Sequence, residues 1–354
     1  MATASITRAQ RGSDFASLSR RITQEGLLDR RPWYYATRAS LVAGLFAGSW
    51  AAFAAVGDSS WQFLVAALLA VAFAQVTLLA HDLAHGQVFR SRRTSRVAGL
   101  FVGNLCVGLS YGWWQDKHTR HHANPNHEDH DPDVAPDVLI WSAKQAEASR
   151  GLPRFVGRWQ AFLFFPLLTL EGWNLHVSSL RAMRRRTLKN RGAEALLLLA
   201  HFAAYFVAVF AVLPPGRAVL FLLVHQACFG LYLGCTFAPN HKGMPMMTAE
   251  DELDFLRRQV LTSRNVRGGR VVNTALGGLN YQIEHHLFPS MPTCNLRRAQ
   301  PIVREHCRAL GVDYAESGLL ASWGQALRHL HAAGAPLRGK QQTGSDGPGV
   351  TDQS

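Results

Sequence analysis

The sequence predicts an all-α integral membrane protein with four membrane-spanning helices arranged as two hairpins. The first observation behind this prediction is composition. Of 354 residues, 48% are hydrophobic and only 17% are charged, whereas about 25% of the residues in an average soluble protein are charged. The second observation is a set of four apolar segments that approach the roughly 20 residues a helix needs to cross the hydrocarbon layer. They cover residues 41–56, 61–80, 193–213 and 218–238.

The segment before the first apolar run, residues 1–39, is predicted to be a cytoplasmic N-terminal arm. It contains seven arginines and no apolar stretch that ends in a small-residue cleavage site, so a removable signal peptide is not expected. Residues 40–334 contain no boundary rich in Pro, Gly or Ser and are predicted to form one domain. Residues 335–354 are poor in large apolar side chains and are predicted to be a disordered tail.

Two short connections join the apolar segments in pairs, GDSS at 57–60 and PPGR at 214–217. Each pair is therefore predicted to be a helical hairpin. Lysine and arginine lie almost entirely elsewhere, in the N-terminal arm, in 90–192 and after residue 239. Because positive residues stay on the cytoplasmic side during insertion, we expect both turns to face outward and the bulk of the chain to face the cytoplasm.

Two shorter apolar runs, 97–114 and 160–175, are interrupted by Gly, Asn, Pro or Glu. We predict that both lie at the membrane interface, although six crossings are also compatible with the sequence. The net charge of +13 lies mostly outside the apolar runs. This position favours an anionic membrane surface over nucleic acid as the partner of the basic residues.

The first histidine cluster, HDLAH, places His81 and His85 directly after the second apolar run. Residues four positions apart lie on one face of a helix, so both imidazoles can reach the same metal ion. Taken alone, this pair fits two histidines at a membrane interface equally well.

Two further clusters repeat helical spacing. They are HTRHH, with His118, His121 and His122, and QIEHH, with Gln282, His285 and His286. Adjacent histidines on a helix point about 100° apart, so they can reach two neighbouring metals, or one metal and one other polar group. Imidazole suits several transition metals, but so many histidines exceed what closed zinc sites need. A redox pair of irons that oxidises lipid C–H bonds fits better.

HDLAH, HTRHH and QIEHH, in this order, resemble the three histidine boxes of the membrane fatty acid desaturases, and the resemblance extends over residues 30–330. FAPNHKGM at 237–244 and NYQIEHHLFP at 280–289 look most like bacterial acyl-CoA desaturases related to the front-end, Δ6-like type. The resemblance implies a four-helix membrane stem under a cytoplasmic helical cap that holds a di-iron site. It also implies a multi-pass protein of the bacterial inner membrane with its active site on the cytoplasmic side.

The resemblance also implies a set of iron ligands, and it indicates no catalytic group beyond them. The implied ligands are His81, His85, His118, His121, His122, His241, His285 and His286. Gln282 stands where many stearoyl-type relatives have a histidine. It would coordinate through its amide oxygen, act through water, or not bind.

The activity implied by the resemblance is O2-dependent introduction of a cis double bond into a fatty acyl chain, carried as acyl-CoA or acyl-lipid. No haem-binding HPGG, GxGxxG-bearing domain or ferredoxin cysteine spacing is present in the sequence, so a separate ferredoxin or flavoprotein reductase using NAD(P)H is expected to supply electrons. A di-iron lipid hydroxylase on the same scaffold is the alternative. A metal transporter would place histidines inside the spans, whereas these clusters lie at or beyond the span ends.

Two acidic residues follow the second cluster in a loop rich in Pro, Asn and Asp. We predict that Asp131 and Asp133 orient box histidines through hydrogen bonds, and that His127 and His130 of the same loop are not ligands.

The remaining histidines are isolated from the clusters. His201 and His225 fall inside apolar runs and are predicted to be hydrogen-bonded packing groups, whereas His176 fits packing or the site equally well. The five cysteines form no CxxC pair and are predicted to be reduced.

Overall fold

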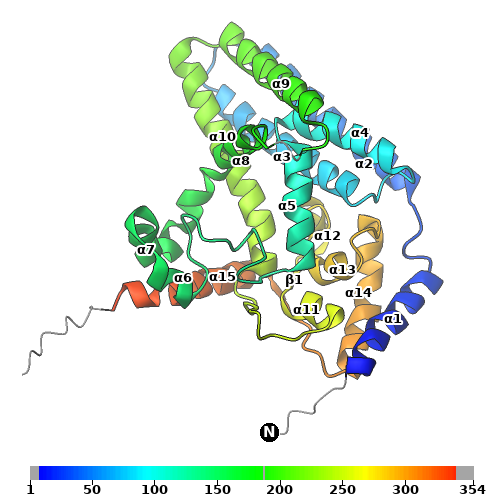
Figure 1. Cartoon of the computed structure of the whole chain (residues 1–354). Helices are drawn as coiled ribbons and strands as arrows, with labels where there is room; N and C mark the ends of the chain where they lie inside the picture. Colours follow the sequence, from blue (N-terminus) through cyan, green and yellow to red (C-terminus); the bar gives the residue numbers. More distant parts are fainter. Residues whose placement is uncertain (1–7, 186–187, 340–354) are drawn as a thin grey trace, which may run out of the picture.

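The computed structural model describes residues 8–185 and 188–339 and is built almost entirely of helices (Figure 1). The elements in chain order are α1 (Arg8–Gln24), α2 (Pro32–Val56), α3 (Gln62–Ala84), α4 (Arg92–Leu100), the π-helix η1 (Phe101–Val107), α5 (Tyr111–Ala123), α6 (Ala143–Ala148), α7 (Gly151–Leu168), α8 (Glu171–Ala182), α9 (Arg191–Val212), α10 (Pro215–His241), α11 (Phe255–Leu261), β1 (Asn265–Arg267), α12 (Gly269–Ala275), α13 (Gln282–Leu287), α14 (Thr293–Ala309), β2 (Glu316–Gly318), α15 (Leu319–Ala333) and the 3-10 helix η2 (Ala335–Leu337).

Four of these helices, α2, α3, α9 and α10, are long and apolar enough to cross a membrane, as the sequence predicted. Three of them extend well beyond the apolar runs. α2 begins at Pro32. Proline is suited to the first turn of a helix because a backbone N–H at that position would have no partner within the helix. α3 continues into the first histidine cluster and is capped by His85. α10 continues to His241, so this histidine ends the helix rather than following it.

The region predicted to lie at the membrane interface after α3 is a bent element. The helical run of α4 and η1 meets α5 at an angle of 111°. Gly108, in the left-handed conformation, ends η1. The bend turns α5 away from the membrane helices, and Figure 1 shows α5 and α10 running from these helices toward the rest of the molecule.

The core of the membrane region is formed by α3 and α10, the two most buried spans. Phe53, Phe73, Phe221 and Phe229 are fully buried there, and α2, η1 and α9 pack around them. α8 also packs closely on α10, because Gly230 faces Gly172 at backbone contact distance. This packing holds the ends of α3 and α10 next to each other.

A second core lies at the opposite end of the molecule in Figure 1 and joins α1, α11, α13 and α14. It contains the buried side chains of Leu18, Leu256, Ile283 and Val303. A smaller core packs α7 and α15 against the last turns of α10. The N-terminal arm thus contributes α1 to the second core.

Two further features were not predicted from the sequence. β1 and β2 pair in parallel, with Asn265 opposite Glu316. This strand pairing connects the segment after α11 to the start of α15. The predicted C-terminal tail begins with η2, whose Leu337 is buried, and residues 340–354 lie outside the described residues.

The two short connections predicted to form hairpin turns lie beside each other. The first follows α2 and contains Asp58, and Arg217 lies in the first turn of α10. An ion pair joins Arg217 to Asp58. The beginnings of α3 and α10 therefore lie at one end of the bundle, and the histidine-bearing ends of both helices lie at the other.

Candidate metal centre

The first histidine cluster lies on the last turn of α3. His81 is buried within the helix, and His85 caps it, with its backbone N–H donating to the carbonyl of His81. The intervening Asp82 forms an ion pair with Arg38 of α2 and accepts a hydrogen bond from Thr293 at the start of α14. These contacts fix the rotation of the last turn, so that both imidazoles face α5.

The second cluster lies on α5. This helix begins cleanly because the Ser110 hydroxyl accepts a hydrogen bond from the backbone N–H of Trp113. The indole of Trp114 stacks on the ring of His118 with centroids 4.5 Å apart. The third cluster lies on α13, a six-residue helix in which every residue is buried.

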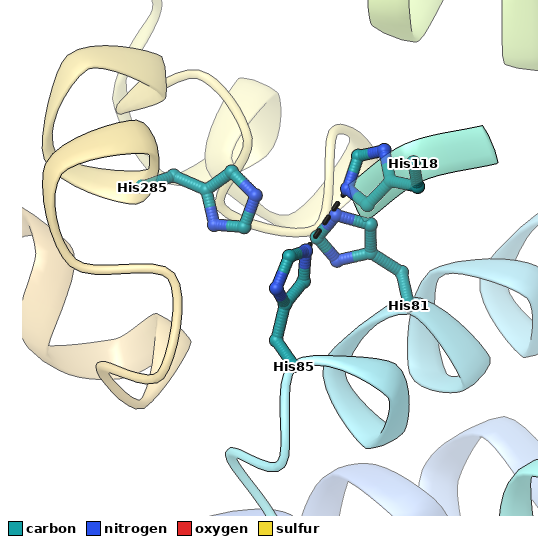
Figure 2. A group of neighbouring side chains, drawn as sticks. All are labelled: His81, His85, His118 and His285. Carbon is teal, nitrogen blue, oxygen red and sulfur yellow. Dashed lines mark hydrogen bonds between the residues drawn. The ribbon is translucent and has the colours of Figure 1, made fainter. Parts of the chain in front are cut away.

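Both histidines of the first cluster and one from each of the other two form a first group, which consists of His81, His85, His118 and His285. One ring nitrogen of each residue lies within 4.8 Å of those of the other three. Figure 2 shows the rings converging from three separate segments. The Nε2 atoms of His85 and His118 are 2.9 Å apart. Four imidazoles in this arrangement can hold a metal ion.

A second group consists of His121, His241 and His286. The Nε2 atoms of His121 and His241 are 3.3 Å apart. The second and third boxes therefore divide their histidines between the groups. Because neighbouring residues on a helix diverge by about 100°, His285 faces the first group and His286 the second.

His122 lies between the two groups. Its Nε2 is 3.1 Å from Nε2 of His118 in the first group. Its ring stacks on that of His286 in the second group, with centroids 4.2 Å apart. The two groups are thus direct neighbours.

The Nδ1 atoms of the second group all face oxygen atoms that can only accept. His121 faces the carboxylate of Asp131 at 2.9 Å, His241 the carbonyl of Thr262 at 3.0 Å, and His286 the amide oxygen of Gln259 at 2.8 Å. Each Nδ1 must therefore carry the hydrogen, which leaves the lone pair on Nε2, directed toward the centre of the group.

Several buried ring nitrogens of the histidine clusters have no hydrogen-bond partner among the described residues. They are Nε2 of His81 and His286, Nδ1 of His122 and both nitrogens of His285. An unpaired buried polar atom costs roughly 1–3 kcal/mol, and a bound metal ion would satisfy it. Burial also lowers the pKa of His118, His122, His285 and His286 well below the usual value. Neutral imidazoles are the form that binds a metal, so the residues fit one.

Gln282 lies at the edge of the second group. Its amide nitrogen is 2.9 Å from Nε2 of His241, and its amide oxygen accepts a hydrogen bond from Asn240. Asn240 and His241 are the last two residues of α10. The contact therefore joins the third box to α10.

The predicted contact between Asp131 and a box histidine is present. Asp133 lies further away, 3.5 Å from Nδ1 of His121, and forms an ion pair with Lys117. His127 and His130 lie in the following loop with rings 4.4 Å apart and belong to neither group.

The isolated histidines lie in the packed interior, away from both groups. His176 donates to the carbonyl of Gly108, and His201 donates to that of Leu105. His225 is paired with the hydroxyl of Tyr205 at 2.6 Å. Packing is therefore the role of His176, which the sequence left open. The five cysteines are free thiols.

The residues that hydrogen-bond to the histidine clusters and to His241 carry no recognisable pattern in the sequence. Gln259, Thr262 and Asn265 have no helical spacing relative to the histidine clusters, yet each contacts a cluster or His241. Glu284, inside the third box, accepts hydrogen bonds from Asn265 and Tyr314. Burial raises its pKa to about 7.

The sequence was compared with those of known protein families. The sequence model of the family described as fatty acid desaturase matches residues 58–318, most of the chain, including all three clusters and His241. The chain belongs to the fatty acid desaturase family. Its helical architecture, its four apolar helices and its histidine groups agree with that membership.

Three named relatives of this chain come from three different organisms. The chain is 29% identical over 326 residues to the acyl-lipid (9-3)-desaturase of Physcomitrium patens, covering 90% of this chain and 62% of the relative. It is 30% identical over 321 residues to the Delta(5) fatty acid desaturase fat-4 of Caenorhabditis elegans, covering 86% and 70%. It is 33% identical over 333 residues to the acyl-lipid 8-desaturase of Rebecca salina, covering 90% and 74%.

Proposed function

We propose that this desaturase introduces a cis double bond into a fatty acyl chain in an O2-dependent reaction at a non-haem di-iron centre. The observation that carries the proposal is the pair of adjacent histidine groups, assembled from three boxes and the end of α10. Both groups lie where the apolar helices α3 and α10 end, at the boundary of the region that a bilayer would surround.

In this proposal, each histidine group holds one iron ion. The ligands are His81, His85, His118 and His285 for one iron, His121, His241 and His286 for the other, and His122 at the position between them. When bound, the irons would supply the O2-dependent oxidation of C–H bonds that side chains alone cannot perform.

The protein's own residues hold and shield the centre. Asp131, Gln259 and the Thr262 carbonyl keep hydrogen on Nδ1 of their histidines, so that Nε2 is available without reorganisation. Trp114 covers the ring of His118 and limits access of water. A rigid, shielded centre favours reaction at one carbon–carbon bond, since the acyl chain must be held in one position.

Gln282 supports the second group in this proposal. Its amide already lies against Nε2 of His241, and a half-turn of the amide would present oxygen instead of nitrogen. From this position the amide oxygen of Gln282 could bind the iron ion directly or through a bridging water molecule.

The proposed reaction also needs a fatty acyl substrate and a source of electrons. Relatives named as acyl-lipid and Delta(5) desaturases support a fatty acyl substrate, carried by a lipid or by coenzyme A. We propose that a separate ferredoxin or flavoprotein reductase using NAD(P)H supplies the electrons. We also propose that the protein lies in a bacterial inner membrane, with the centre on the cytoplasmic side.

Expression of the full chain in a host with a simple lipid profile tests the proposal. Mass spectrometry that locates double bonds should find a new olefin, which disappears in the His121→Ala and His286→Ala variants. Purified protein should contain two iron ions per chain, and removal of iron by a chelator should abolish product formation until Fe(II) is restored. Hydroxy-acyl products without new olefins would instead establish the hydroxylase.

A further inference from the structure

The segment 259–265, which begins in the last turn of α11 and ends at the first residue of β1, contacts every element that bears a member of the second histidine group. We call this segment the bracket. The side chain of Gln259 and the residues Thr262, Ser263, Arg264 and Asn265 are all buried. None of them is a histidine-box residue.

The bracket holds the end of α10 through three backbone carbonyls. The backbone N–H of Arg264 donates to Asn240, and its guanidinium donates to the carbonyls of Pro239 and Lys242. Carbonyls at a helix C-terminus lack partners within the helix, and a cation there is favourable. Nδ1 of His241 donates to Thr262 of the same segment.

The bracket also holds the third box. The side-chain oxygen of Asn265 accepts from the backbone N–H of Ile283, and its amide nitrogen donates to Glu284. α13 has only six residues, so its position depends on such contacts, because a helix this short is not stable alone.

Gln259 is the residue that joins the second and third boxes. Its amide oxygen accepts from Nδ1 of His286 at 2.8 Å, and its amide nitrogen donates to the carbonyl of His122 at 2.9 Å. The side chain is 1% exposed, so water cannot replace either bond. An amide is the one neutral side-chain group with an acceptor and a donor at this spacing.

From this geometry, and resting on the di-iron centre proposed above, we propose that Gln259 is a positioning residue for the second iron site. It fixes the hydrogen on Nδ1 of His286 and sets the distance between α5 and α13. Loss of its acceptor frees the His286 ring to rotate and to take the other tautomer, which weakens metal binding in the second group and leaves the first group intact.

Two variants of Gln259 and one matched control test this role. Gln259→Met keeps the volume but removes both hydrogen bonds, whereas Gln259→Glu keeps an acceptor for His286 and replaces the donor to the His122 carbonyl by a second carboxylate oxygen. Gln145→Met is the control, because Gln145 is also buried and bridges the backbone of Trp141 and Val134 away from the histidines.

The probe is Co²⁺, titrated into metal-free full-length protein in detergent, with binding followed by visible absorption. We expect wild type to bind two cobalt ions per chain. Gln259→Met should weaken one of the two sites by about 10- to 100-fold, the usual effect of losing a group that orients a ligand. Gln259→Glu and Gln145→Met should keep both sites within a few-fold of wild type.

Proton NMR of the cobalt-loaded protein gives a second readout, because exchangeable imidazole N–H protons of bound histidines are strongly shifted. Gln259→Met should lose one such signal, and Gln259→Glu should retain but shift it. If Gln259→Met does not fold, an unshifted signal in Gln259→Glu would overturn the inference.

The outcomes separate this inference from the proposed function. Two tight cobalt sites in Gln259→Met, or an equal loss in Gln145→Met, would overturn the role of Gln259 and leave the di-iron centre standing. A wild-type protein that binds no cobalt would overturn both.

Discussion

Nδ1 of His121 lies 2.9 Å from the carboxylate of Asp131, ten residues further along the chain. The carboxylate also accepts hydrogen bonds from the backbone N–H groups of Asn126 and Asp133. These contacts fold the loop after α5 back onto the helix and hold the orientation of a buried imidazole.

Asp131→Asn should therefore weaken the second histidine group. The amide is similar in size but neutral, and its nitrogen competes with its oxygen for the position facing His121. We expect product formation to fall by about 10- to 100-fold, measured as olefin per milligram of membrane protein. Asp129→Asn, at an exposed position of the same loop, should behave as wild type. Equal activity of Asp131→Asn and wild type would remove Asp131 from the centre.

Histidines of the groups and of the loop should respond differently to alanine. His118→Ala removes a member of the first group and should reduce new olefin to the background of the host. His127→Ala removes a ring that belongs to neither group and should retain activity within a few-fold of wild type. The same mass spectrometric assay compares both, with protein amounts matched by immunoblot. Wild-type olefin formation by His118→Ala would contradict the assignment of the first group.

Substitution of Gln282 tests whether its amide supports metal binding by the second group. Gln282→Ala removes the amide beside His241 and should lower iron content and product by about 10-fold or more. Gln282→His restores a nitrogen ligand at the same place and should keep more iron than the alanine variant. Iron per chain, measured by mass spectrometry of the purified protein, decides between them. Full iron content in Gln282→Ala would show that this residue does not support the site.

The contact of α8 with α10 depends on Gly230. A Cβ atom there would lie 2.5 Å from the backbone nitrogen of Gly172 and from the carbonyl oxygen of Leu168. Gly230→Ala should thus destabilise the protein by about 1–3 kcal/mol, seen as a lower unfolding temperature in detergent. Gly44→Ala is the matched control, because a Cβ in α2 at that position meets no atom within 4 Å. Equal unfolding temperatures for the two variants would show that the two helices can separate without cost.

The sequence by itself determined the class of the protein and most of its candidate ligands. Hydropathy and length predict the four spans because every backbone group in a membrane must be satisfied within its own helix, which makes the signal local. The histidine boxes are also local, since their spacing follows the period of one helix. His241, by contrast, was identified chiefly by resemblance to the family.

The tertiary structure alone decided how the histidines divide. His118 and His121 belong to one box but to different groups, and His285 and His286 separate in the same way. The bracket that carries Gln259 has no periodic pattern in its sequence. Its hydrogen bonds to α5, α10 and α13 join residues from 18 to 137 positions apart. Such contacts depend on how α5, α10 and α13 pack together, because hydrogen bonds between distant segments form only after packing has brought their buried groups within reach of each other.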